Sequence, residues 1–319
     1  MRENVHILLK KLTRETVIAA NFFRPAADRR RLERQLRGRE EFRRLREADC
    51  VIVSFGKSGR TWLRVMMSRF YQLRFGLAQR HLIGFANFHD MNPAIPKILF
   101  THDNYVRDFT GNTGSKADYY DRKVILLVRH PADTAVSQYF QWRYRMRPGK
   151  KSLNDYPSHG AEVPIFDFVH DHPAGLDKVI EFLNDWSSEM PRLPDLLVVR
   201  YEDMRAAPEA TLRRVLTFVG AAPSDDELRQ SVEFGSVDNM RKLEQGKVFW
   251  MSGGRMTARD KTNPDAHKVR RAKVGGFRDY FDDAQVAAIE AHIRARLRPG
   301  FGYGAEGEAA PPSPARASA

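Results

Sequence analysis

From residue 50 onward, short and continuously apolar runs alternate with longer segments of helical periodicity. The runs predict buried strands at 50–55, 97–102, 123–129 and 195–201. Apolar residues recur at helical spacing over 61–75, 132–146, 175–189, 208–219, 224–234 and 282–298. Fully apolar strands that alternate with helices are typical of a parallel sheet covered on both faces. We therefore predict an α/β domain with a single doubly wound parallel sheet flanked by helices.

Two of these helices carry local start signals. Pro208 stands at the first turn of its segment, where a missing backbone N–H costs nothing. Ser224 and Glu227 have the spacing of a capping box, in which each side chain bonds the other residue's backbone N–H. These signals place the starts of the helices at 208 and 224.

Residues 1–48 form a basic extension with a helical pattern. Its first part is apolar, and residues 24–46 hold ten arginines against four acidic residues. One interpretation is a helical extension that packs on the domain with solvated arginines, which is the usual fate of a charge run. The other is peripheral contact of residues 1–46 with an anionic membrane. We favour packing, and the apolar residues that predict the first helix are Val5, Leu8, Leu9, Leu12, Val17, Ile18, Phe22 and Phe23.

Composition limits the number of domains and the cellular compartment that the chain is expected to occupy. The 319 residues are 42% hydrophobic and 29% charged, which suits one large folded domain over 49–303 and a disordered tail over 304–319. The single cysteine, Cys50, fits a reducing compartment and excludes an internal disulfide. The chain contains no apolar run of membrane-spanning length. We expect a cytoplasmic protein, with the inner membrane surface as the open alternative, and no nucleic-acid partner.

The segment from Val51 to Arg64 predicts a strand, a loop and a helix that together bind an anion. The loop supplies Gly56, Lys57, Ser58 and Gly59, and such a turn directs backbone N–H groups and a helix N-terminus at one point. The loop is not a Walker A motif, because Val51 occupies the position of the required glycine. A P-loop-like site for a phosphate-like group is therefore predicted.

Two later segments add to this picture. The strand over 123–129 ends in Arg129, and Ser137 follows eight residues later; residues 270–281 form a basic, glycine-containing stretch. In this order, the three segments resemble the signatures of sulfotransferases that use 3′-phosphoadenosine 5′-phosphosulfate (PAPS). The resemblance is to the cytosolic-type domain, covers residues 50–300, and leads us to expect a bacterial member.

The resemblance implies a donor site for PAPS and no metal. Lys57 would stabilise the leaving phosphate, and Trp62 would stack on adenine with Tyr201 nearby. The other implied donor contacts are Ser58, Gly59, Arg60 and Thr61 at the 5′-phosphate, and Arg129, Ser137, Arg270, Arg271, Lys273 and Gly275 at the 3′-phosphate.

A histidine at a strand end is the candidate base. Thr101-His102 matches a Thr-His pair of the family, and a histidine titrates near neutrality, so it can take an alcohol proton. His89, in a loop expected to border the acceptor, is the rival.

Several positions depart from the family pattern. Gly56 replaces a proline, and Arg60 replaces a threonine, where it either adds charge on the sulfate side or faces solvent. Val237 stands where the family has a second adenine-stacking phenylalanine, so the adenine contact is weaker or Phe234 substitutes. Two further departures fall in the late motif: Ala272 for glycine and Phe277 for tryptophan.

The predicted function is sulfuryl transfer from PAPS to an acceptor hydroxyl on a carbohydrate, a lipid head group or a small alcohol or phenol. Residues 76–96 and 143–165, which mix aromatic and basic side chains, are expected to shape the acceptor pocket. Two alternatives stay open at this point: a nucleotide-dependent phosphoryl transferase, and a non-catalytic binder of anionic polymer or membrane.

Overall fold

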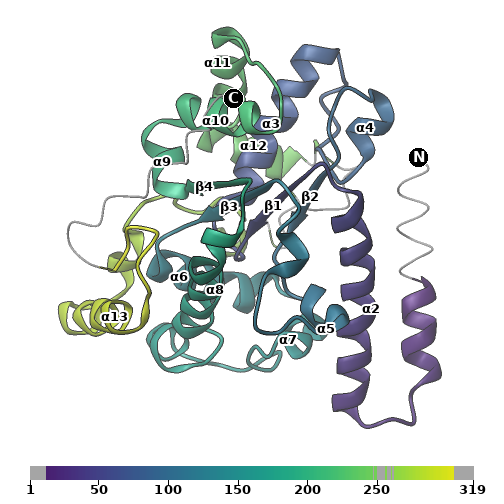
Figure 1. Ribbon diagram of the computed structural model, residues 1–319. Coiled ribbons are helices and arrows are strands. Elements are labelled where there is room, and N and C mark those ends of the chain that lie inside the picture. The colour runs from purple at the N-terminus through teal and green to yellow at the C-terminus, as the bar shows by residue number, and fades with distance from the viewer. Residues whose placement is uncertain (1–11, 247, 250–255, 257–259, 261, 305–319) are drawn as a thin grey trace.

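The core of the molecule is one parallel sheet of four strands. The computed structural model describes residues 12–246, 248–249, 256, 260 and 262–304. The strands lie in the order β2-β1-β3-β4 and all pair in parallel (Figure 1). The predicted doubly wound parallel sheet is therefore confirmed. The strand bounds, one or two residues shorter than predicted, are β1 Cys50–Ser54, β2 Ile98–Thr101, β3 Val124–Val128 and β4 Leu196–Arg200.

The apolar strands are buried because helices cover both faces of the sheet. Val51 and Val53 belong to one hydrophobic cluster, whereas Cys50 and Ile52 belong to another on the opposite face. Figure 1 shows one group of helices above the sheet and one below. The upper group is α3 Arg60–Phe75, α10 Pro208–Phe218 and α11 Asp225–Phe234; the lower group is α6 Pro131–Phe140, α8 Leu176–Glu189 and α13 Asp283–Arg296.

The helix predicted over 132–146 is divided. Helix α6 ends at Phe140, and a π-helical turn follows over Gln141–Arg145. The N–H of Met146 closes this turn on the carbonyl of Gln141 at 2.8 Å. Such wide turns are frequent at functional sites, and sequence periodicity does not reveal them.

The helix starts predicted at 208 and 224 are confirmed. The two backbone N–H groups of the Ser224–Glu227 capping box are both bonded, at 2.9 and 3.3 Å. Further α-helices after β1 are α4 Asn87–Met91, α5 Val106–Thr110, α7 Pro148–Leu153, α9 Tyr201–Ala206 and α12 Val237–Gly246.

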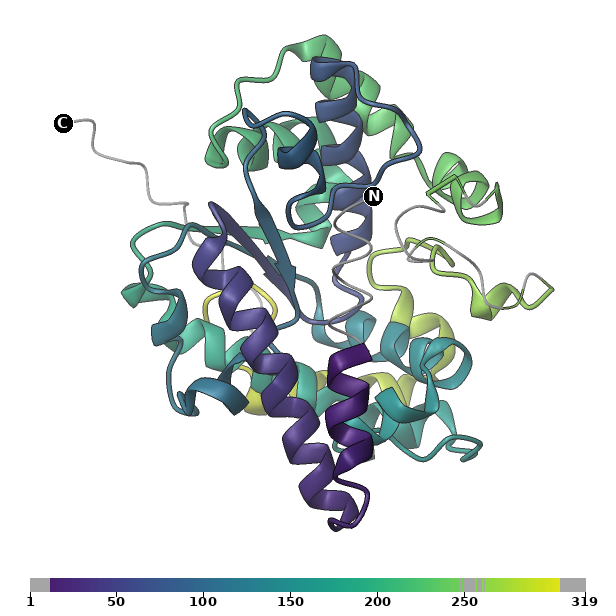
Figure 2. The ribbon, with the colours of Figure 1, turned by 90° about the vertical axis from the view of Figure 1, so that its right-hand side faces the viewer.

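The N-terminal extension packs against the domain. Helix α2 (Ala26–Glu47) contacts α5 and β2, and a helix over 12–20 lies antiparallel beside it (Figures 1 and 2). Arg14 pairs with Glu40 at 3.1 Å, and Arg34 bonds Asp108 at 3.2 Å. Predicted apolar residues before position 12, and the tail from 305, lie outside the described residues. None of the described helices combines the length and apolarity needed to span a bilayer.

Candidate active site

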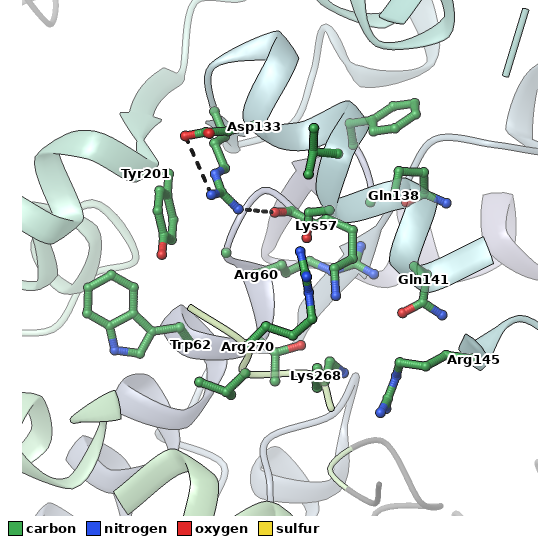
Figure 3. Close-up of a pocket in the computed structure, with 18 of the residues that line it drawn as sticks. Lys57, Arg60, Trp62, Asp133, Gln138, Gln141, Arg145, Tyr201, Lys268 and Arg270 are labelled. Carbon is green, nitrogen blue, oxygen red and sulfur yellow. Dashed lines mark hydrogen bonds and ion pairs between the residues drawn. The ribbon is translucent and has the colours of Figure 1, made fainter. Parts of the chain in front are cut away.

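A cavity of about 700 Å³ lies at the carboxyl ends of the four strands (Figure 3). Each strand end delivers one polar residue to its wall: Lys57 after β1, His102 after β2, Arg129 after β3 and Tyr201 after β4. The crevice outside the carboxyl ends of a doubly wound sheet is the usual ligand site of this architecture. The parallel topology therefore gathers residues that are up to 144 positions apart, from Lys57 to Tyr201.

The loop after β1 contains two residues with positive φ, Lys57 and Gly59, and only glycine adopts this conformation readily. Gly59 caps α3 with φ of 95°, and a Cβ there would lie 2.6 Å from a Tyr201 ring carbon. Glycine is thus required at this position by both the backbone conformation and the close approach of Tyr201. Lys57 has φ of 76°, a left-handed conformation that costs energy for a residue with a Cβ and often marks a functional site.

Lys57 lies in a strongly cationic setting. Burial, and then the neighbouring charges of Arg145, Arg270 and Arg129, together lower its pKa to about 7, while Glu244 opposes them. The next loop residue, Ser58, is buried. A bound polyanion would reverse the effect of the cations and restore a full positive charge on Lys57. The loop therefore suits a ligand with several negative charges.

His102 is held by two hydrogen bonds that define its tautomer. Nδ1 lies 2.7 Å from the carbonyl oxygen of Ser54, which can only accept, so Nδ1 carries the proton. Nε2 is then the lone-pair nitrogen, and Nη2 of Arg60 donates to it at 2.5 Å. Burial first, and then the charge of Arg60, lower the pKa of His102 well below its usual value. The imidazole is thus neutral at pH 7, as a general base must be.

Arg129 joins the three segments that the sequence singled out. It donates to the carbonyl oxygens of Lys57 at 3.3 Å and Lys273 at 3.2 Å, and it lies over the ring of Tyr201 at 4.3 Å. Asp133 lies 3.6 Å from the same guanidinium. Arg129 is thereby aimed into the cavity from a defined position.

Two buried carboxylates hold the ends of the late basic segment. Asp133 accepts from the backbone N–H groups of Gly275 at 2.8 Å and Phe277 at 2.9 Å. Glu244 accepts from the N–H groups of Lys268 at 2.8 Å and Val269 at 3.2 Å, and it pairs with Arg145 at 3.1 Å. Buried carboxylates that accept several backbone bonds fix a loop in one place.

The side chains of that segment are held by local contacts. Arg270 donates to the hydroxyl of Tyr280 at 3.0 Å and lies over the ring of Phe140 at 3.4 Å. Arg271 and Lys273 both pair with Asp279, at 3.0 and 2.7 Å. These cations line the cavity on the same side as Arg129.

Aromatic side chains form the end of the cavity beside α3. The rings of Trp62 and Tyr201 meet edge to face with centroids 5.9 Å apart. Val237 lines the cavity, whereas Phe234 packs with Trp62 in a separate hydrophobic cluster and does not replace the missing family phenylalanine. Two rings and a valine are therefore available to a flat apolar group.

Most of the predicted site residues meet at this cavity. The two that do not line it are Ser58 and Gly275, whose neighbours Gly59 and Gly276 do. His89 is not among the described residues of the wall, and its Nδ1 lies 2.8 Å from the carbonyl of Ile95. Those that line it are Lys57, Gly59, Arg60, Thr61, Trp62, His102, Arg129, Ser137, Tyr201, Arg270, Arg271 and Lys273.

The expectation for residues 76–96 is wrong. No described residue of this segment lines the cavity, because Ile83, Phe88 and Ile95 are buried in the hydrophobic cluster beneath α3. Residues from the segment over 143–165 do line the cavity, and so do Asn104, Tyr105 and Lys178. Of the two positions expected for Arg60, the structure has the one inside the cavity, where the guanidinium contacts His102.

Sequence reasoning missed several residues of the site. Asp133 could have been found, because it lies in the first turn of the helix that follows Arg129, close to the strand end that carries this arginine. Glu244, Lys268 and Glu41 carry no such signal. Glu41 of α2 accepts a bond from the hydroxyl of Thr101, next to His102.

Comparison with known proteins agrees with this geometry. The family model described as "Sulfotransferase domain" matches residues 47–300. The chain is 24% identical over 275 residues to Cytosolic sulfotransferase 15 of Arabidopsis thaliana, covering 79% of this chain and 72% of the relative. It is 26% identical over 282 residues to Cytosolic sulfotransferase 14 of the same plant, covering 78% and 75%.

Solved structures share the fold. Retinol dehydratase in complex with retinol and PAP (3′-phosphoadenosine 5′-phosphate) superposes with a TM-score of 0.55 at 18% identity, covering 79% of this chain and 82% of that one. Mouse sulfotransferase SULT7A1 complexed with PAP gives 0.51 at 19% identity, covering 81% and 90%. Because the family model spans most of the chain and the site lies where the fold places it, this chain belongs to the sulfotransferase family, the enzymes that use PAPS as their sulfuryl donor.

Proposed function

We propose that the protein transfers a sulfuryl group from PAPS to an acceptor hydroxyl, with Lys57 at the leaving phosphate and His102 as the base. The observation that carries the proposal is that a loop lysine, a neutral histidine and an arginine clamp converge on one cavity from three strand ends. Family membership favours this reaction over phosphoryl transfer and over simple anion binding.

The proposed reaction follows from the tautomer of His102. The acceptor oxygen attacks sulfur, the bond between sulfur and the bridging oxygen breaks, and the hydroxyl proton passes to Nε2. Negative charge develops on the 5′-phosphate of the departing PAP, where the ammonium of Lys57 stabilises it. Arg60 must leave Nε2 before the hydroxyl can bind there, and the negative sulfuryl oxygens would attract its guanidinium.

The donor contacts divide between the two phosphates. The loop from Lys57 to Thr61 and the N-terminus of α3 would hold the 5′-phosphosulfate. Arg129, Ser137 and the late segment would hold the 3′-phosphate, for which a planar guanidinium is well suited. Trp62 and Tyr201 offer the aromatic contact for adenine.

Calorimetric titration with PAP and with 5′-AMP tests the assignment. Bonds to charged groups contribute about 1.5–3 kcal/mol each, so loss of the 3′-phosphate should weaken binding at least about tenfold. Arg129→Ala should remove most of the difference, whereas Arg39→Ala, an exposed arginine of α2 that does not line the cavity, should keep it. Equal affinity of the unaltered protein for PAP and 5′-AMP would refute the donor assignment.

A further inference from the structure

One wall of the cavity is polar and basic although no predicted donor contact lies on it. This wall begins two residues beyond His102 and is completed by the segment around α7 and by α8. We call it the lysine wall, and its members are Asn104, Tyr105, Arg147, Lys150, Asn154, Tyr156 and Lys178.

Hydrogen bonds hold two ammonium groups in this wall. Nζ of Lys150 donates to the hydroxyl of Tyr105 at 3.0 Å, and that hydroxyl donates to the side-chain oxygen of Asn154 at 3.0 Å. Asn154 in turn donates to the carbonyl of Lys150 at 2.9 Å and accepts from Nζ of Lys178 at 2.5 Å through its own carbonyl. Lys150 and Lys178 are therefore positioned by the same asparagine.

Neither ammonium has a carboxylate partner within the described part of the chain. The salt bridges found there include neither lysine. Asp133 is the one acidic residue among the described residues that line the cavity, and it already holds Arg129, Gly275 and Phe277. Within the described residues, the two ammonium groups of the wall are thus held by neutral groups and not by a carboxylate in direct contact.

Burial disfavours the charged forms of Lys150 and Lys178. Burial lowers the pKa of Lys150 to about 8, and Arg37 adds to the effect while Glu33 opposes it. Burial likewise lowers the pKa of Lys178. An anion bound between the two groups would relieve the cost of burying two like charges.

Different charged neighbours act on the lysine wall and on Lys57 in the loop after β1. The cations that act most on Lys57 are Arg145, Arg270 and Arg129, whereas the first charged neighbours acting on Lys150 are Arg37 and Glu33 of α2. The phosphates of PAPS match the first group, since those residues converge with the loop after β1. The lysine wall therefore needs an anion other than the phosphates of PAPS.

On the basis of the function proposed above, we propose that the acceptor is a hydroxyl-bearing anion whose carboxylate, phosphate or sulfate group binds Lys150 and Lys178 while its hydroxyl meets His102. Asn104 and Asn154 add hydrogen-bonding groups suited to further hydroxyls on the acceptor. This site differs in kind from one made for an uncharged alcohol such as the retinol held by one structural neighbour.

The test separates acceptors by charge before they meet the enzyme. A small-molecule and oligosaccharide extract is divided on an anion exchanger into a retained and an unretained fraction, and each is incubated with the full-length protein and radiolabelled PAPS. We expect label to enter the retained fraction at least tenfold more than the unretained one. Lys150→Gln/Lys178→Gln should lose at least nine-tenths of this labelling, whereas Lys242→Gln, an exposed lysine outside the cavity wall, should keep it.

The outcomes distinguish this inference from the proposed function. Label in the unretained fraction, label in neither fraction, or full labelling by the double variant overturns the anionic acceptor. Calorimetric binding of PAP to the same preparations shows separately whether the donor site works. If PAP binds and label enters only the unretained fraction, the sulfotransferase assignment survives and the lysine wall has another role.

Discussion

Nη2 of Arg60 donates to Nε2 of His102 at 2.5 Å, so the lone pair of the proposed base is occupied by a cation from the phosphate-binding loop. The opposite nitrogen is fixed on the carbonyl of Ser54. The donor loop and the base are thereby in direct contact. Binding of an anionic donor to the loop and release of the base can occur together, because both depend on one guanidinium.

Removing the charge of Arg60 should shift the pH dependence of catalysis. Arg60 lowers the pKa of His102, and a base works only when unprotonated, so activity is lost as pH falls through that pKa. Arg60→Ala should raise the pKa and move the acid limb of the kcat/KM profile to higher pH. Arg60→Lys should leave the limb close to its original position, and an unmoved limb in Arg60→Ala would contradict the pairing.

Lys57→Met should lower turnover strongly without lowering the free energy of unfolding. Loss of one group that stabilises developing negative charge costs about 10²–10³-fold in turnover. Because burial and nearby cations penalise the ammonium, its removal should leave the free energy of unfolding unchanged or raise it. Steady-state kinetics and urea unfolding measure the two quantities, and near-normal turnover would contradict the role of Lys57.

Glu244→Ala should be strongly destabilising. The Glu244 side chain is fully buried, and it holds Arg145 and the N–H groups of Lys268 and Val269. Breaking a buried pair by removing one partner costs about 3–5 kcal/mol. Glu244→Gln should cost less, because its amide oxygen still accepts the backbone bonds. Urea unfolding at pH 7 compares the variants, and equal losses would mean that the backbone bonds contribute little.

Glu41→Gln should change how stability depends on pH. Burial, and then the charge of Asp103, raise the pKa of Glu41 from 4.5 to about 7. The folded protein therefore binds this proton more tightly than the unfolded chain, and the associated stability is lost as pH rises through 7. Between pH 4.5 and 8 the unaltered protein should lose up to about 3 kcal/mol more than the variant. Parallel urea-unfolding curves across this range would show that Glu41 is not buried as a neutral acid.

Sequence alone determined the sheet, the order of its elements and many of the residues that line the cavity. The strands over 50–55 and 123–129 are apolar on both faces, which restricts them to a covered parallel sheet. Lys57, Gly59 and Arg129 follow such strands directly, so the edge where they meet was predictable from the chain. Asp133 was within reach of the same reasoning, because it lies in the first turn of the helix that follows Arg129.

Only the tertiary structure decided what surrounds these residues. The contact between Arg60 and His102 joins loops after two different strands, and no local pattern predicts the distance between them. Lys268 and Lys178 line the cavity, and Glu244 holds the backbone of Lys268, only because separate elements pack together there. The π-helical turn after Phe140 likewise has no counterpart in the sequence pattern. Hydrophobic periodicity records which residues are buried along one element, whereas burial of a charge depends on the side chains that separate elements bring to it.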